Sequence, residues 1–168
     1  MIQTIDELLA WRDRLAIAAA THHHPPVFTV EEAARHTHHL PGGHTKNLFL
    51  EDRQGGLWLV TCLDHQPIKV NALARYLKAP RFAFASAERL RAALGVEPGS
   101  VTPFALVNDR DRRVTPVFDA KMLACERLNF HPLRNTATTT IRAADLLRFA
   151  AATGHEPVVV DLDATLTA

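Results

Sequence analysis

The sequence is poor in cysteine and carries almost no net charge, and each of these deficits excludes a class of function. Its two cysteines, Cys62 and Cys125, form no CxxC pair, so we expect reduced, buried thiols and no cysteine-based zinc site. A formal net charge of +1 excludes a surface that attracts nucleic acid everywhere, so any RNA contact must be local. No apolar run approaches the roughly 20 residues of a membrane helix and no secretory signal is present. These absences predict a cytoplasmic protein without membrane partners.

The composition is that of one ordinary folded domain. Hydrophobic residues make up 47% and charged residues 22% of the 168 positions, so neither disorder nor a fibrous repeat is indicated. No internal repeat and no linker divides the sequence. We therefore expect a single domain over residues 1–168, large enough to bury a core without disulfide or metal staples.

Capping residues and glycines mark the expected helices. Two capping boxes, Thr4 with Glu7 and Thr29 with Glu32, open the first two helices. The first should end before His22, because two prolines soon follow, and the last should end at Gly154. The other expected helices cover residues 30–35, 70–77, 86–94 and 120–128, and the last begins near residue 140.

Apolar and β-branched runs mark the expected strands. One hairpin joins residues 47–50 and 57–63, and a second joins residues 104–107 and 114–118. Further extended segments are expected at residues 81–85, 130–133, 137–140 and 157–162. Because hairpins outnumber parallel crossovers, the pattern predicts an α+β fold, with helices packed on a curved, mostly antiparallel or mixed sheet.

Three local patterns suggest chemistry but have plainer interpretations. The end of the chain, VVVDLDATLT from Val158 to Thr167, matches the DxDxT motif of aspartyl-phosphate phosphatases. In those enzymes the motif begins the fold and the remaining catalytic strands follow it, whereas here the sequence stops at Ala168. We therefore expect an edge or central strand with a polar tail.

The second pattern is a crowd of histidines, and the third is a cysteine close to a histidine. Seven of the ten histidines lie between residues 22 and 44, but their spacing fits no known ligand pattern, so we expect flexible loop histidines and no metal. Cys62 is close in sequence to Asp64 and His65, as in a cysteine nucleophile with its base. Alternation along a strand sends Cys62 and His65 to different sides, which favours a buried structural cysteine.

Three separated segments are more informative together than alone. They are GGHTKNLFL from Gly42, GSVTPFAL from Gly99 and NFHPLRNTATTTI from Asn129. Taken singly, Lys46 would be an exposed lysine at a strand end, residues 99–103 a proline-bounded loop, and His131 a core histidine.

Together with HPPVFTVEEA near the start and AATGHEPVVVDL near the end, these segments resemble the YbaK/ProX family of tRNA deacylases. That family is related to the editing insertion of bacterial prolyl-tRNA synthetase, and the resemblance covers nearly the whole chain. Because the resemblance extends to the end of the chain, the sequence is more similar to the ProX branch, which deacylates alanyl-tRNA(Pro), than to the YbaK branch, which acts on cysteinyl-tRNA(Pro). The resemblance therefore implies an enzyme that removes alanine from proline tRNA without a cofactor or a metal.

The resemblance also implies roles for individual residues. Lys46 would anchor the terminal phosphate or polarise the ester, and it would act by charge and position rather than as a general base. Asn47 and His131 would hydrogen-bond the amino group or the ribose, whose 2′-hydroxyl would help to activate water. Backbone N–H groups of the glycine-bearing loop would face the ester carbonyl, with a wall formed by Gly99, Val101, Thr102 and Pro103.

A local excess of positive charge offers a place for the tRNA backbone. Six basic residues face one acidic residue between positions 69 and 91. The four assigned to tRNA contact are Lys69, Arg75, Lys78 and Arg81. A solvated helix surface explains the same pattern equally well. The partners expected are mischarged tRNA(Pro) and either prolyl-tRNA synthetase or an elongation factor.

Two alternatives stay open. The same chemistry could act on a tRNA that carries serine or cysteine, since pocket side chains decide this. The chain could also be a tRNA-binding or synthetase-binding module without activity, although Lys46 and an intact loop at residues 99–103 argue against a decayed site. DNA binding is not expected, because no helix-turn-helix or basic arm is present.

Overall fold

The computed structural model describes all residues from 1 to 168, and its centre is one mixed sheet of eight strands. The strand order is β1-β7-β6-β2-β3-β5-β8, and β4 pairs with β2 outside this path. The strands are β1 (Ala19–His23), β2 (Gly43–Asp52), β3 (Leu57–Leu63), β4 (Phe82–Phe84), β5 (Val114–Asp119), β6 (Arg127–Phe130), β7 (Ala137–Arg142) and β8 (Val158–Val160).

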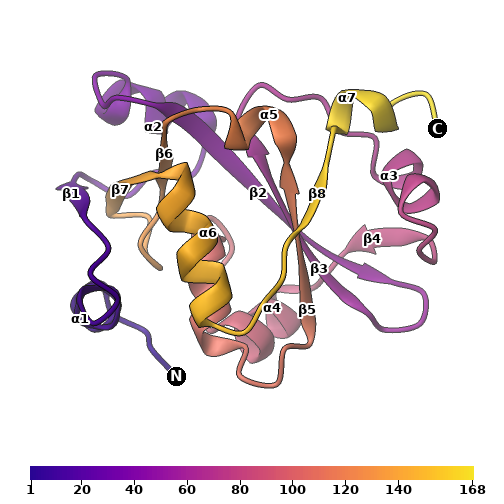
Figure 1. The fold of residues 1–168 in the computed structure, drawn as a ribbon, viewed down its shortest axis with the longest axis horizontal. Helices are drawn as coiled ribbons and strands as arrows, with labels where there is room; N and C mark the ends of the chain where they lie inside the picture. Colours follow the sequence, from indigo (N-terminus) through magenta and orange to yellow (C-terminus); the bar gives the residue numbers. More distant parts are fainter.

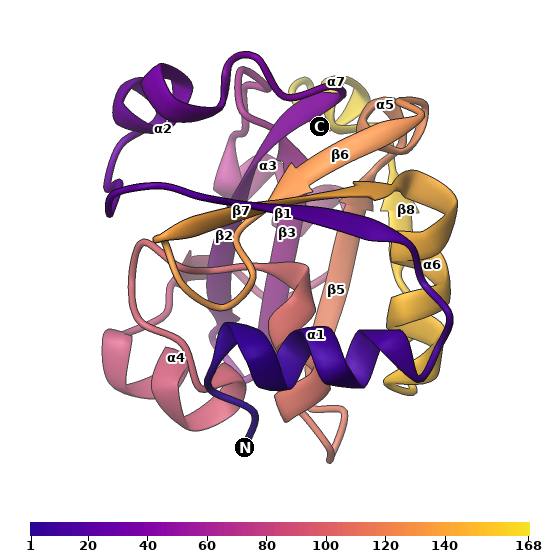
Figure 2. The ribbon, with the colours of Figure 1, turned by 90° about the vertical axis from the view of Figure 1, so that its left-hand side faces the viewer.

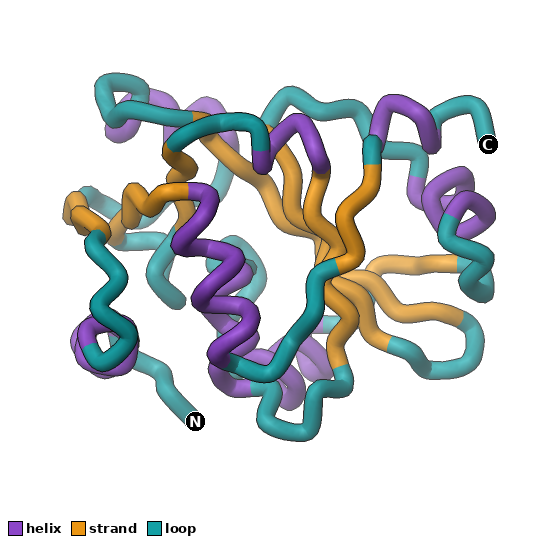
Figure 3. The backbone as a smooth tube through the Cα atoms, viewed as in Figure 1, coloured by secondary structure: helices purple, strands orange, loops and turns teal.

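Helices surround this sheet, and Figure 3 shows them on both sides of the strands that cross the middle of the molecule. They are α1 (Ile5–Asp13), α2 (Val30–Thr37), α3 (Val70–Tyr76), α4 (Ala87–Leu94), the 3-10 helix η1 (Pro103–Asn108), α5 (Ala120–Leu123), α6 (Ala143–Ala152) and α7 (Leu162–Thr165). No helix combines the length and the apolar character that crossing a membrane would require.

The sheet mixes both kinds of pairing, which confirms the predicted α+β fold. Four pairs are antiparallel, β1 with β7, β6 with β7, and β2 with both β3 and β4. Three are parallel, β2 with β6, β3 with β5, and β5 with β8. The long strand β2 joins the two halves of the sheet, since it starts against β6 and continues against β3 and β4 (Figure 1).

Apolar side chains are buried on both faces of the sheet, and β3 shows why. Leu59 and Val60 are adjacent, and alternation along the strand sends them to opposite faces. Leu59 joins the larger cluster, which includes residues of α1, α4, η1 and α6, whereas Val60 joins the smaller one with residues of α3 and α7. Both side chains are fully buried, so the continuous apolar run of β3 serves two cores at once.

Several local predictions are confirmed. The capping box of Thr4 and Glu7 opens α1. At α2 only half of the predicted box forms: Thr29 accepts from the Glu32 amide, but the Glu32 carboxylate accepts from the Phe28 amide instead of that of Thr29. Ser86 accepts from the Arg89 amide at the start of α4, and Gly95 ends that helix. The first hairpin is present as β2 and β3, longer than predicted at its first strand.

The first helix is shorter than predicted because distant pairing prevails over local propensity. Helix α1 ends at Asp13, and Ala16 adopts a left-handed φ of 55°. Residues 19–23 then form β1, in register with β7, where Ala19 faces Ile141 and His23 faces Ala137. Hydrogen bonding to a strand more than a hundred residues away thus claims an alanine-rich segment that could continue a helix.

The second predicted hairpin is wrong. Residues 103–108 form a 3-10 helix that has Pro103 in its first turn and Thr102 as its cap, and residues 114–119 pair in parallel with β3. A short apolar run that is buried all round has no period that separates strand from helix, whereas proline suits a first helical turn. Sheet pairing also shifts two predicted helix boundaries. The helix predicted over residues 120–128 ends at Leu123 and is followed by β6, and the last helix begins only at Ala143, after β7.

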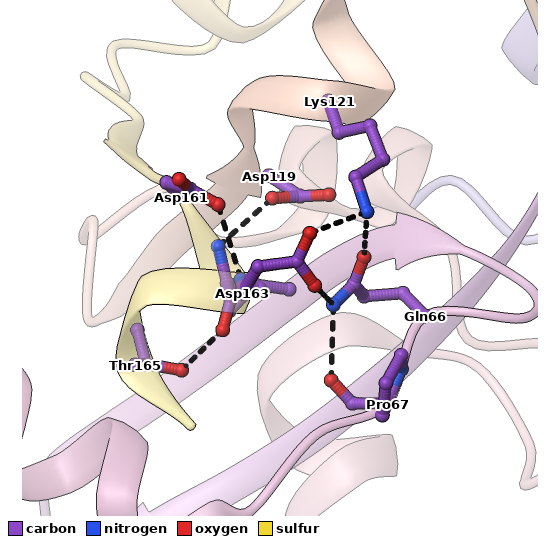
Figure 4. Close-up of polar contacts among 8 residues, drawn as sticks. Gln66, Pro67, Asp119, Lys121, Asp161, Asp163 and Thr165 are labelled. Atoms are coloured by element: carbon purple, nitrogen blue, oxygen red, sulfur yellow. Dashed lines mark hydrogen bonds and ion pairs between the residues drawn. The ribbon is translucent and has the colours of Figure 1, made fainter. Parts of the chain in front are cut away.

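The acidic end of the chain is an edge strand followed by a short helix, α7, rather than a polar tail. Figure 4 shows how its aspartates are used. Asp161 accepts from the Asp163 amide, and Asp163 pairs with Lys121 at 2.6 Å and accepts from Gln66 at 2.8 Å. The Leu162 amide donates to Asp119 at 3.1 Å. The contacts of Asp119 and Asp163 hold α7 against the sheet, and Asp161 caps the helix. The predicted edge strand is therefore present, whereas the predicted polar tail is wrong.

Candidate active site

A cavity with a volume of about 390 Å³ is bounded by α2, the start of β2 and the end of β6. Figure 2 looks onto the side of the molecule where these elements meet. The predicted residues that line the cavity are Lys46, Asn47, Gly99, Val101 and His131. They come from three segments far apart in the sequence, so the fold brings together most of the predicted site.

Lys46 and Asn47 reach the cavity from β2. Asn47 Oδ1 accepts from Thr61 Oγ1 on β3 at 2.8 Å, which orients the amide and leaves its NH2 group without a protein acceptor. Lys46 is half-buried, faces Cys62 across the strand pair, and forms no ion pair. The wall therefore offers an N–H donor and an unneutralised positive charge to a polar ligand.

A buried asparagine holds the start of β2 in place. Asn129 Nδ2 donates to the carbonyl oxygens of Pro41 and Gly43 at 3.0 and 3.2 Å, and its Oδ1 accepts from Thr140 Oγ1 at 2.6 Å. Gly42 permits this approach, since its φ is +93° and a Cβ there would lie 2.3 Å from a backbone oxygen of β6. Asn129 was not predicted as a positioning residue, although it is the first residue of the segment NFHPLRNTATTTI.

His131 presents a neutral imidazole to the cavity. Burial lowers its pKa below the ordinary 6.5, outweighing the hydrogen bond to the Ala137 carbonyl, and nearby His24 lowers it further. Because Nδ1 donates to the Ala137 oxygen at 3.0 Å, the other ring nitrogen, Nε2, keeps its lone pair. His131 can therefore accept a hydrogen bond from a ligand amino or hydroxyl group.

This protonation state predicts a pH dependence. Between pH 6.5 and 8 the rate ratio of wild type to His131→Gln should stay constant, because a group with a lowered pKa remains neutral there. Below the ordinary pKa of 6.5 the ratio should fall, because protonation removes the Nε2 acceptor. Taking the ratio of ester hydrolysis rates cancels ionisation of the substrate. A ratio that already falls between pH 8 and 7 would contradict a neutral His131.

The glycine-bearing loop is divided between the cavity wall and the core. Gly99 is exposed with φ +90°, and Val101 is half-buried beside it. Thr102 and Pro103 are buried beneath the loop and do not line the cavity. Thr102 caps η1 by accepting from the Phe104 amide at 3.3 Å, so the structure gives these two residues a supporting position instead of the predicted substrate contact.

The predicted tRNA-binding residues lie elsewhere. Lys69, Arg75, Lys78 and Arg81 are exposed on α3 and the segments that flank it. Figure 1 shows α3 toward one end of the long axis and α2, which borders the cavity, toward the other. Two other basic side chains of the region are neutralised: Arg89 pairs with Glu51 at 2.7 Å and Arg91 with Glu97 at 2.8 Å. Of the four predicted residues, Arg75 donates to Ala168 O at 3.0 Å, whereas Lys69, Lys78 and Arg81 form no ion pair.

The histidines near the cavity are ordered in secondary structure, so the expected flexible loop is wrong for most of them. His22 lies on β1 and His36 on α2. The rings of His24 and His36 stack at a centroid distance of 5.9 Å, and those of His22 and His39 meet edge-on at 5.1 Å. No three ligand-type side chains are grouped closely enough to hold a metal ion.

Cys62 has no partner for nucleophilic chemistry. Burial raises the pKa of its thiol to about 12, although the charge of Lys46 acts in the opposite direction. His65 is exposed and bonds Asp64 at 3.2 Å. The expected structural cysteine is confirmed, because a buried protonated thiol is a poor nucleophile.

Comparison with known proteins shows which proteins this chain is similar to. The sequence profile of the aminoacyl-tRNA editing domain matches residues 24–149. A "Prolyl-tRNA synthetase associated domain-containing protein 1" from Danio rerio is 41% identical over 94% of this chain and 86% of its own length. The "Prolyl-tRNA editing protein ProX" of Acetoanaerobium sticklandii is 31% identical over 92% of this chain and 95% of its own.

Solved structures share the fold. One, described as a candidate trans-editing enzyme for prolyl-tRNA synthetase, has a TM-score of 0.71 and 20% identity, covering 94% of this chain and 93% of its own. A hypothetical protein has a TM-score of 0.75 at 20% identity, covering 92% of this chain and 97% of its own. At such low identity the likeness establishes the architecture alone.

Proposed function

The chain belongs to the aminoacyl-tRNA editing domain family, and we propose that this aminoacyl-tRNA deacylase acts in trans on alanyl-tRNA(Pro), releasing alanine and free tRNA(Pro). The observation that carries the proposal is the convergence of Lys46, Asn47, His131 and the Gly99 loop on one cavity. None of these side chains is a serine, cysteine or carboxylate, which suits direct attack of water on an ester.

The reaction is hydrolysis of the ester between alanine and the terminal ribose. Water adds to the carbonyl carbon and negative charge develops on the carbonyl oxygen. The bond to the ribose oxygen then breaks, and that oxygen takes up the proton that the attacking water gives up. The positive charge of Lys46 and the backbone N–H groups of the Gly99 loop would stabilise the developing charge. The free NH2 group of Asn47 and the Nε2 lone pair of His131 would orient the ribose and the substrate amino group.

The character of the cavity wall favours alanine. A volume of about 390 Å³ exceeds what an alanyl group needs, so the cavity would also take in the terminal ribose. Val27, Ala33, Ala34 and Val101 supply an apolar part of the wall, which suits a methyl group better than a hydroxyl or a thiol. Proline would be rejected by its size, as a second sieve requires.

The test is deacylation of proline tRNA charged in parallel with labelled alanine, serine, cysteine or proline. We expect rapid release of alanine and slow release of the other three. Faster release of serine or cysteine would keep the chemistry and move the specificity. Hydrolysis of none of the four esters would favour the alternative of a tRNA-binding or synthetase-binding module.

The four exposed basic residues around α3 extend the proposal to the tRNA body. Lys69, Arg75, Lys78 and Arg81 lie away from the cavity, where they could meet phosphates of a tRNA whose 3′ end occupies the site. The double substitution Lys78→Glu, Arg81→Glu should raise KM for charged tRNA about tenfold at low salt and reduce the slope of log KM against log salt by about two.

Arg89→Ala together with Arg91→Ala is the matched control, because both arginines already pair with glutamates. An unchanged salt slope in the Lys78 and Arg81 variant would leave these residues as a solvated surface. The association with a prolyl-tRNA synthetase named for several relatives is proposed for this chain as well, as is a location in the cytoplasm.

A further inference from the structure

An exposed phenylalanine stands at the mouth of the cavity. Phe28 borders the cavity, yet it is 73% exposed. Its ring lies against the Gly99 loop, since a Cβ built on Gly99 would lie 3.7 Å from Phe28 Cδ1. Scattered apolar side chains on a surface need no explanation, but this one adjoins the proposed reaction site.

The backbone around Phe28 is fixed on both sides. Val27 donates its N–H to the Asn135 carbonyl at 3.3 Å, and its own carbonyl accepts from Asn135 Nδ2 at 2.8 Å. The Phe28 N–H donates to Glu32 Oε2 at 2.9 Å, and Thr29 next to it caps α2. The ring therefore projects from an anchored segment. Stacking on it requires little further ordering of the protein backbone, so the entropy cost of binding is small.

We propose that Phe28 is the stacking platform for the base of the terminal nucleotide that carries the aminoacyl ester. The inference rests on the proposed function, because an ester held at Lys46 and the Gly99 loop brings its own nucleotide to the cavity mouth. An aromatic face binds any base by stacking, so Phe28 positions the terminal nucleotide without reading its identity. A flat nucleobase matches the exposed face of the ring, whereas the alanyl group is too small to cover it.

The test compares two short substrates, alanyl-CCA and an analogue whose terminal ribose lacks its base. Phe28→Ala should raise KM for alanyl-CCA about tenfold and leave kcat within twofold. Phe28→Tyr should restore KM, and neither substitution should affect the abasic substrate. Phe84→Ala is the matched control, because Phe84 is 67% exposed on β4 and does not border the cavity.

Equal losses on both substrates would overturn the proposal and make Phe28 a support of the cavity wall. Unchanged kinetics on both would also overturn it and leave the ring as a contact for a protein partner. If wild type hydrolyses neither ester, the stacking platform can still be tested with uncharged CCA and the variant Phe28→Trp. The signal is the tryptophan fluorescence of the variant minus that of the wild type, which comes from Trp11 and Trp58. Quenching by CCA but not by its abasic analogue supports stacking, and equal signals refute it.

Discussion

Replacing Lys46 with alanine is expected to lower kcat/KM for alanyl-tRNA(Pro) at least 100-fold, about the effect of removing one donor to a developing oxyanion. Lys46 lines the cavity and has no carboxylate partner to neutralise it. Its charge is therefore available to the ester or the terminal phosphate. The measurement is single-turnover deacylation, with the unfolding midpoint recorded to show that the variant is folded.

Two further variants separate charge from packing at this position. Lys46→Met keeps most of the apolar stem and should be as inactive as alanine, whereas Lys46→Arg keeps the charge and should retain part of the rate. A Lys46→Met enzyme close to wild type would show that the stem matters and the charge does not. Activity of Lys46→Ala within a few-fold of wild type would remove Lys46 from the proposed mechanism.

The sequence predicted best what depends on neighbouring residues. Helix starts at Thr29 and Ser86 were readable because a side-chain oxygen and an amide three residues later suffice to cap a helix. It predicted poorly what depends on distant pairing. Nothing near Ala19 reveals that it will face Ile141, and residues 103–108 carry no period that distinguishes a strand from a 3-10 helix.

The residues of the candidate site also depend on contacts between distant parts of the sequence, which local patterns do not show. Lys46, Gly99 and His131 were found through a family resemblance, since no local pattern relates a strand end, a loop and a buried histidine. Asn129 was missed because its role consists of hydrogen bonds to Pro41 and Gly43, more than 80 residues earlier. Phe28 was likewise missed, because exposure at a cavity mouth is a property of the folded chain.

A buried pair far from the cavity should dominate stability. Asp109 and His155 are both buried, and His155 Nε2 lies 2.8 Å from Asp109 Oδ2. Thr153 donates its hydroxyl hydrogen to the Ala150 carbonyl, so at 2.8 Å it can only accept from His155 Nδ1. His155 thus donates from Nδ1 to Thr153, and its Nε2 lies within hydrogen-bonding distance of the Asp109 carboxylate.

Asp109→Asn is expected to lower the free energy of unfolding by about 3 kcal/mol, because its NH2 group would face either the Arg113 or the Val114 amide, which now donates to a carboxylate oxygen, and would leave that buried donor without an acceptor. The measurement is urea unfolding at pH 7. The double variant Asp109→Asn, His155→Gln should cost less than the sum of the single losses, because the two groups are coupled. Additive losses would show that the two side chains stabilise the fold independently.

Asp109 is also expected to contribute to the loss of stability at acid pH. Burial would raise the pKa of Asp109, but the hydrogen bonds from His155 and from the Val114 and Arg113 amides outweigh it and lower the pKa below 3.8. A carboxyl with a lowered folded-state pKa stabilises the protein above its unfolded value, and this contribution is lost as pH falls through the folded-state pKa. As the pH falls from 5 to below the folded-state pKa of Asp109, the free energy of unfolding should therefore decrease more for wild type than for Asp109→Asn. Parallel losses would mean that other carboxylates govern acid unfolding.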